Sequence, residues 1–375
     1  MARRGWLDDR SFADLVALTQ LLPGPASSQL GIAIGSGRAG IAGGVAAWLG
    51  FTLPSAVGLT ILGLATGSLD LAGAGWVAGL ELAAAAVVLV ALVAMARSLA
   101  PDPLRRAIAI GAALLVLALP SSLMQVVTIA IGAAVGVAAH RRPSEPAHDP
   151  EPAQPGAGPP ARRIPTRVGI ASLATLGVLL AGLPVATALT GESAGGLALA
   201  DAFFRAGALV FGGGHVVLPL LHATVVAPGW VSEAAFLAGY GATQAVPGPL
   251  FSVAAYLGAV AVEAPGLPGG VGGAALALGA VFLPSFLLVY GVLPFWDRLR
   301  EARRARRALA GASAAVVGLL AAALVTPIGT AAIGGPLDVM WVGLAALALG
   351  TRRIPVVLVV AGLALGGELA GRLAG

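Results

Sequence analysis

Apolar runs long enough to cross a lipid bilayer recur along almost the whole chain, and they constrain its fold more than any other feature. A transmembrane helix needs about 20 mostly apolar residues. Helices and closed barrels are the structures that satisfy every backbone polar group in lipid, and runs of this length favour helices. Charged residues make up 10% of the 375 residues, too few to keep a soluble surface hydrated. The prediction is an all-α, polytopic transmembrane helix bundle.

About 12 apolar segments are expected, and a polar linker divides them. The linker, residues 140–167, contains eight prolines and no apolar run, so we expect it to be exposed and without regular structure. The segments near 106–119 and 122–139 are divided only by Pro120 and Ser121, so one bent helix is an alternative to two. The expected segments are 13–35, 41–66, 75–97, 106–119, 122–139, 168–190, 201–226, 236–262, 271–295, 308–325, 330–349 and 354–373.

The two halves of the chain repeat each other. The sequence Thr-Gln-Leu-Leu-Pro-Gly-Pro at residues 19–25 returns 224 residues later as Thr-Gln-Ala-Val-Pro-Gly-Pro. Leu-Pro-Ser at residues 53–55 returns 230 residues later. Two motifs in the same order at nearly one spacing indicate a duplication. The predicted organisation is a first repeat at 1–139, the linker at 140–167, a connecting transmembrane helix at 168–190 and a second repeat at 191–375.

The arginines predict that the two repeats are inverted in the membrane. The loop at Asp70 contains no arginine, whereas the equivalent loop of the second half contains six between residues 298 and 307. Cytoplasmic loops carry the excess of basic residues, so equivalent loops lie on opposite sides. We expect Arg303 and the linker to be cytoplasmic and Asp70 periplasmic, with helix 168–190 as the odd crossing that inversion requires. Inverted repeats with broken helices are typical of secondary transporters.

The Pro-Gly-Pro segments are the sharpest candidates for a functional site. Each proline removes a backbone donor and disfavours helix before it, and the glycine between allows close backbone approach. Irregular backbone at membrane depth is tolerated where it is buried in protein or lines a wet cavity, and a helix that restarts there offers free amides to an anion. A plain structural kink is the alternative. Substitutions at Gly132 and Gly362, far from both motifs in sequence, are expected to be mild.

Other side chains could assist. The glycines in Phe-Gly-Gly-Gly-His, residues 211–215, could form a backbone anion site or simply allow close helix packing. Gln20 and Gln244 directly precede the breaks and could coordinate a substrate or bond between helices. Glu81 lies in an apolar run, where an ionisable group is costly and often functional; a structural hydrogen bond is the alternative. The sequence has no cysteine, no hydrolase motif and no nucleotide-binding motif, which favours coupling to an ion gradient.

In these motifs the chain resembles the chromate transporter (CHR) family, long-chain type with two fused domains. The matching residues are Trp6 to Gly31, Gly50 to Ser55, Val210 to His215, Gln244 to Pro249 and Leu283 to Ser285. The first half lacks the family's Phe-Gly-Gly-Pro motif and the helix that carries it, so an upstream helix encoded in frame is expected.

The resemblance implies export of chromate across the bacterial inner membrane, driven by the proton-motive force. Sulfate, a tetrahedral dianion of similar size, remains an alternative substrate. A membrane scaffold and an intramembrane enzyme are the alternatives of other classes. No metal, cofactor or nucleic acid is expected; the expected partners are the oxyanion, protons, lipid and, as one assembly, a second copy in a homodimer. The candidate substrate-binding residues are Gln20, Pro23, Gly24, Pro25, Gly212, Gly213, Gly214, His215, Gln244, Pro247, Gly248 and Pro249, and Glu81 is the candidate for proton coupling.

Overall fold

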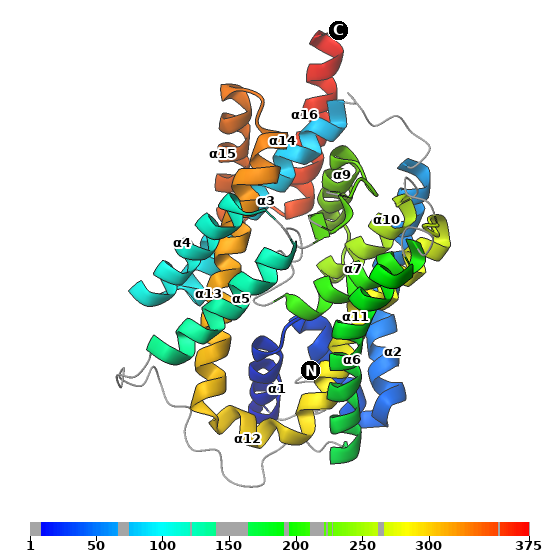
Figure 1. The fold of residues 1–375 in the computed structure, drawn as a ribbon. Coiled ribbons are helices and arrows are strands. Elements are labelled where there is room, and N and C mark those ends of the chain that lie inside the picture. The colour runs from blue at the N-terminus through cyan, green and yellow to red at the C-terminus, as the bar shows by residue number, and fades with distance from the viewer. Residues whose placement is uncertain are drawn as a thin grey trace.

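The chain forms a bundle of helices (Figure 1). The computed structural model describes residues 9–66, 75–120, 122–139, 164–190, 195–210, 221–222, 224–226, 228–261, 266–351 and 353–374. Within these ranges the regular secondary structure is helical, with no strand. Five helical stretches are long and apolar enough to cross a membrane, and three shorter ones are apolar as well. The predicted all-α membrane bundle is confirmed.

The helices follow the predicted segments closely. The first repeat contains α1 (Asp9–Leu21), α2 (Ala26–Thr66), α3 (Gly75–Leu99), α4 (Pro103–Ala118) and α5 (Ser122–Ala139), and α6 (Thr166–Thr190) follows the linker. The second repeat contains α7 (Gly195–Leu209), α9 (Glu233–Ala245), the 3-10 turn η4 (Leu250–Ser252), α10 (Val253–Val260), α11 (Gly270–Val292), η5 (Leu293–Phe295), α12 (Trp296–Glu301), α13 (Arg303–Ala323), the π turn η6 (Leu324–Gly329), α14 (Thr330–Ala332), α15 (Pro336–Gly350) and α16 (Val356–Ala374).

Segments 13–35 and 236–262 are each two short helices rather than one span. The Pro-Gly-Pro turns separate α1 from α2 and α9 from η4 and α10. A second, sharp turn at Ala39 and Gly40 then divides α2 itself, and Gly40 adopts φ +65°. Beyond this turn α2 runs back along its own first part. The two parts lie in close contact, since a Cβ on Gly35 would collide with the carbonyl group of Gly43. Both interruptions agree with the predicted pattern: the first lies at the Pro-Gly-Pro motif, and the second lies between the predicted segments 13–35 and 41–66.

The second repeat contains the same arrangement after α7. After its Pro-Gly-Pro turn, η4 and α10 lead into the long helix α11. Helix α10 packs along α11, and a Cβ on Gly258 would collide with the carbonyl group of Gly273. Each repeat therefore contains a short helix, a Pro-Gly-Pro turn and a second short helix that folds back on a long one.

Equivalent long helices of the two repeats run antiparallel. The rings of Trp48 in α2 and Phe286 in α11 lie 5.7 Å apart. Further along α2, Leu64 Cδ2 lies 3.9 Å from where a Cβ on Gly270 would be. Residue numbers thus rise along α2 as they fall along α11. This opposite direction of equivalent helices confirms the predicted inverted arrangement of the repeats.

The last two helices of each repeat pack on the other repeat. Helices α4 and α5 cover α13, and α15 and α16 cover α3 (Figure 1). Glycines bring the backbones close, as small residues do between membrane helices: a Cβ on Gly136 would lie 3.0 Å from Gly311 Cα, and a Cβ on Gly367 would lie 3.1 Å from Gly79 Cα. Each repeat therefore contributes its last two helices to the packing of the other repeat.

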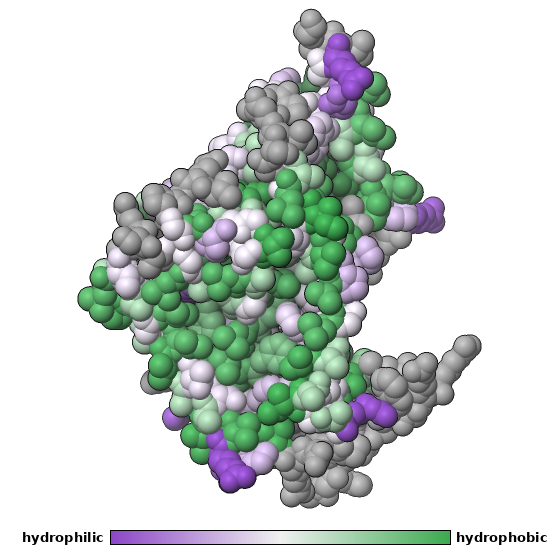
Figure 2. All heavy atoms as spheres, turned by 90° about the vertical axis from the view of Figure 1, so that its right-hand side faces the viewer, coloured by the Kyte–Doolittle hydropathy of each residue, from purple (hydrophilic) through white to green (hydrophobic). Residues whose placement is uncertain are grey.

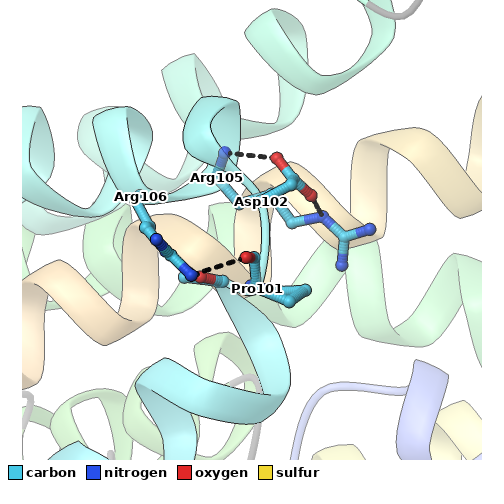
Figure 3. A network of polar contacts seen from close by, with 5 residues as sticks. Pro101, Asp102, Arg105 and Arg106 are labelled. Carbon is cyan, nitrogen blue, oxygen red and sulfur yellow. Dashed lines mark hydrogen bonds and ion pairs between the residues drawn. The ribbon is translucent and has the colours of Figure 1, made fainter. Parts of the chain in front are cut away.

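The structure resolves α4 and α5 as two helices, not one bent helix. Pro120 lies between them, and the two helices pack on each other. Helix α4 starts earlier than predicted because Asp102 caps it: Asp102 Oδ1 accepts a 2.9 Å hydrogen bond from the Arg105 backbone amide (Figure 3). The Arg105 side chain pairs with the same carboxylate at 2.7 Å, and Arg106 donates to the Pro101 carbonyl at 2.8 Å. This network fixes the turn between α3 and α4.

Much of the outer surface is apolar (Figure 2). Helix α6 presents Ile170, Val178 and Leu189 outward, and Leu189 is 82% exposed. Leu114 of α4 and Leu347 of α15 are also more than half exposed. An apolar surface of this extent fits contact with lipid chains and is far beyond what a soluble monomer exposes. The chain is a multi-pass membrane protein.

Candidate ion-binding site

The first Pro-Gly-Pro turn, Pro23 to Pro25, lies in the interior where the two repeats meet. Gly24 and Pro25 are buried. Gly24 adopts φ +113°, in the region that favours glycine. Its amide donates a 2.6 Å hydrogen bond to the Val210 carbonyl, at the end of α7. The first turn is therefore fixed to the start of the Phe-Gly-Gly-Gly-His segment, although Gly212, Gly213, Gly214 and His215 lie outside the described residues.

Two further polar side chains lie beside the first turn. Gln29, fully buried one helical turn into α2, donates from Nε2 to the Pro23 carbonyl at 2.5 Å. Its Oε1 has no hydrogen-bond partner among the described residues. Ser285 of α11, also fully buried, places Oγ 3.0 Å from where a Cβ on Gly24 would be. Because Gly24 has no side chain, polar groups from both repeats approach its backbone closely.

The second Pro-Gly-Pro turn, Pro247 to Pro249, makes the equivalent contact with the first repeat. Gly248 adopts φ +152°, and a Cβ there would collide with the hydroxyl of Ser55. Ser55 belongs to the Leu-Pro-Ser motif of α2, as Ser285 belongs to that of α11. The two repeated motifs therefore meet in space, each Pro-Gly-Pro turn against the Leu-Pro-Ser motif of the other repeat.

The serines at the two turns differ in their hydrogen bonding. Ser55 Oγ lies 2.8 Å from Ser252 Oγ and donates to the Thr52 carbonyl at 2.8 Å. The equivalent residues at the first turn are Ser285 and Ser28, which are 0% and 1% exposed. Neither of their hydroxyls has a hydrogen-bond partner among the described residues. Buried polar atoms without a partner are rare and require an explanation.

The predicted glutamines occupy different surroundings. Gln20, at the end of α1, is exposed in the isolated chain. Gln244, at the equivalent place on α9, is partly buried, and its Nε2 has no partner among the described residues. Neither makes a side-chain hydrogen bond to its turn in the described part of the chain, whereas Gln29 does. Gln29 was not among the predicted site residues. The sequence feature that could have indicated it is a polar amide side chain inside an apolar helix, shortly after the break.

A second polar cluster lies at the start of α9. Glu81 on α3 is partly buried, and α3 packs against α9, the helix that begins at Glu233. Glu233 Oε2 lies 2.7 Å from His222 Nε2, and Glu233 Oε1 is buried without a partner among the described residues. The His222 ring packs edge-on against Phe236 at 5.2 Å. No group of three possible metal ligands occurs within the described residues.

The fold places the chain in a class: two inverted helical repeats that each contain a broken helix are an architecture that recurs among membrane transporters. The chromate transporter family matches residues 1–137 and 197–367, so this chain belongs to that family.

Curated relatives agree with the family match. A chromate transport protein of Pseudomonas aeruginosa is 28% identical over 378 aligned residues, which cover 97% of this chain and 84% of the relative. A probable chromate transport protein of Synechococcus elongatus is 25% identical and covers 86% of this chain and 75% of the relative. No solved structure matches the chain.

Proposed function

We propose that this protein is a secondary transporter that exports chromate across the inner membrane, coupled to the proton-motive force, and thereby confers chromate resistance. The observation that carries the proposal is the buried first turn, where a non-helical segment of one repeat meets Ser285 of the other, a buried serine whose hydroxyl has no partner among the described residues. The relatives named as chromate transport proteins support chromate as the substrate.

The chemistry of the first turn suits a tetrahedral oxyanion. A dianion loses much of its water inside a membrane protein, so the protein must supply replacement donors. Serine hydroxyls and the amides at the start of α2 can donate without fixing a full positive charge beside the ion, and the helix dipole adds attraction. The adjoining glycines 212–214, His215, Gln20 and Gln244 complete the proposed binding residues, together with the second turn.

Proton coupling is assigned to Glu81. Its position within the membrane span and beside Glu233 gives it an environment in which uptake of one proton relieves carboxylate repulsion. His222, in contact with Glu233, offers a path for that proton. A proton entering as chromate leaves would connect the ion movement to the gradient.

Sulfate is the second candidate substrate, because it has the same charge and shape as chromate. A scaffold without transport activity would not require helix breaks at equivalent places in both repeats. An intramembrane enzyme would require a nucleophile with a general base, and neither turn shows such a pair among its described residues.

Reconstituted protein provides the test. Proteoliposomes loaded with buffer of one pH and diluted into another are given labelled chromate or labelled sulfate. We expect chromate flux that depends on the imposed proton gradient and collapses with a protonophore. Flux of sulfate alone would favour the second candidate, and absence of flux of either ion would reject transport of these oxyanions.

A further inference from the structure

The two Pro-Gly-Pro turns are equivalent in sequence but not in hydrogen bonding. We call Ser28 and Ser285 the first serine pair, and Ser252 and Ser55, their equivalents, the second serine pair. The second pair is closed by a hydrogen bond of 2.8 Å, whereas neither hydroxyl of the first pair has a partner among the described residues. All four side chains are at most 2% exposed, so bulk water does not satisfy the first pair.

In a protein with inverted repeats, a difference in conformation between equivalent segments of the two repeats indicates how the protein changes between its two end states. When the two repeats adopt different conformations, exchanging these conformations produces the structure open to the other side. Applied here, the exchange would bring the first serine pair together and separate the second. A bond that exists at one turn and is missing at the other is thus a candidate difference between the two end states.

The first turn also has the composition of a ligand site in the described state. The backbone of Gly24 approaches Ser285 closely, because a Cβ on Gly24 would lie 3.0 Å from Ser285 Oγ, and Gln29 holds the turn through its bond to the Pro23 carbonyl. At the second turn Val253 replaces Gln29, and the serines satisfy each other. A buried hydroxyl without a partner is unfavourable, and a bound oxyanion would supply two acceptors.

We propose that the oxyanion binds between the hydroxyls of the first serine pair beside Gly24, while the second serine pair seals its own turn, and that the two pairs exchange these roles as access alternates. This inference rests on the proposed function for the identity of the ion. The exchange of hydrogen bonds itself does not depend on which oxyanion is carried.

Binding at equilibrium tests the site. Labelled chromate is dialysed against detergent-solubilised protein, which reports binding without turnover. We expect Ser28→Ala and Ser285→Ala each to weaken binding roughly tenfold, the loss of one hydrogen bond to a charged group. Ser55→Ala and Ser252→Ala should change binding less than about twofold yet lower flux in proteoliposomes. The matched control is Ser98→Ala, whose hydroxyl bonds only to its own helix.

Cross-linking tests the exchange, and the absence of native cysteine makes it direct. The double variants S55C with S252C and S28C with S285C are oxidised in membranes without any oxyanion. We expect the pair at 55 and 252 to cross-link several-fold faster. After excess thiols are blocked, either cross-link should stop flux, and reduction should restore it.

The outcomes separate this inference from the proposed function. Equal cross-linking rates for the two pairs, or wild-type chromate affinity in both Ser28→Ala and Ser285→Ala, would overturn the inference even if chromate flux is confirmed. If wild-type protein carries no chromate, the proposed function fails. The cross-linking asymmetry would then still report the exchange, and sulfate would replace chromate as the binding probe. Threonine at position 285 keeps the hydroxyl, so recovered binding in Ser285→Thr would show that the alanine variant lost a donor and not its fold.

Discussion

At the scale of single residues, the central glycine of each Pro-Gly-Pro turn has both a backbone and a spatial requirement. Gly24 at φ +113° and Gly248 at φ +152° lie outside the conformations that other residues adopt readily. A side chain on Gly24 would also lie 2.6 Å from Gln29 Nε2. These positions therefore combine strain with direct contact to the proposed ion site.

We expect Gly24→Val and Gly248→Val to abolish chromate flux. The positive φ alone costs about 1–2 kcal/mol for a residue with a Cβ, and the added side chain would displace polar groups from the site. Flux in proteoliposomes at equal protein amounts is the measurement. Gly362→Val is the control, since a Cβ there meets nothing within 4 Å. Equal flux in all three variants would show that the turns are kinks and that the ion binds elsewhere.

Gly132 is not a neutral control, contrary to the expectation from its sequence position. A Cβ on Gly132 would lie 2.7 Å from the Cβ of Ala315 in α13. Distance along the chain gave no indication of this contact, because it joins α5 of one repeat to α13 of the other. Substitution there would test packing between repeats rather than the ion site.

Glu81→Gln should flatten the pH dependence of chromate flux while leaving the protein in the membrane. The amide keeps the size of the side chain but cannot take up a proton. Flux is measured at a series of internal pH values with the external pH fixed. Glu368→Gln is the matched control, because Glu368 pairs with Arg372 at 2.8 Å on its own helix. An unchanged pH profile in Glu81→Gln would leave this glutamate a structural role only.

The sequence predicted part of this site. Pro-Gly-Pro and Leu-Pro-Ser were recognisable because they recur, and the structure brings them into contact. Ser28 and Gln29 could not be selected in the same way, since a serine or glutamine in a membrane helix more often bonds to its own helix or a neighbour. Which hydroxyls lack a partner is a property of packing across the two repeats, and no local pattern encodes it.

At the scale of elements, the sharp turn inside α2 lies between the predicted segments 13–35 and 41–66, where Ser36 and Arg38 interrupt the apolar sequence. The residues around Ala39 and Gly40 carry no proline, and small residues continue on both sides. What closes the turn is contact between glycine backbones at Gly35 and Gly43. Helix type and approximate ends could thus be predicted from apolar periodicity, but the direction of the chain after each short helix could not.

The packing of α3 on α16 and of α5 on α13 should fail when its glycines acquire large side chains. We expect Gly79→Leu and Gly136→Leu to destabilise the protein by about 1–3 kcal/mol, the usual cost of overpacking. The midpoint of thermal unfolding in detergent, followed by loss of the monodisperse peak, is the measurement. Gly111→Leu on α4 meets nothing within 4 Å and should unfold like the wild type. A normal midpoint in both packed variants would contradict these contacts.

At the scale of the whole molecule, the inverted repeats make a prediction about sidedness. Single cysteines at 303 and 155 should react with a membrane-impermeant maleimide only from the cytoplasmic side, and a cysteine at 70 only from the periplasmic side. Positions 70 and 155 lie outside the described residues, so labelling supplies independent information. Reaction of 70 and 303 from the same side would contradict the predicted orientation.

The last two helices of each repeat pack on the other repeat, and this arrangement also determines when the buried helices become covered during synthesis. Helix α3 includes the buried run from Ala83 to Val88, but α15 and α16, which cover part of its length, are synthesised after all the other described helices. Until then α3 must share that face with lipid or with the insertion machinery. Folding is therefore expected to include a late step in which α15 and α16 dock on α3. A chain truncated before residue 336 would leave this face of α3 uncovered and is expected to be degraded by membrane proteases.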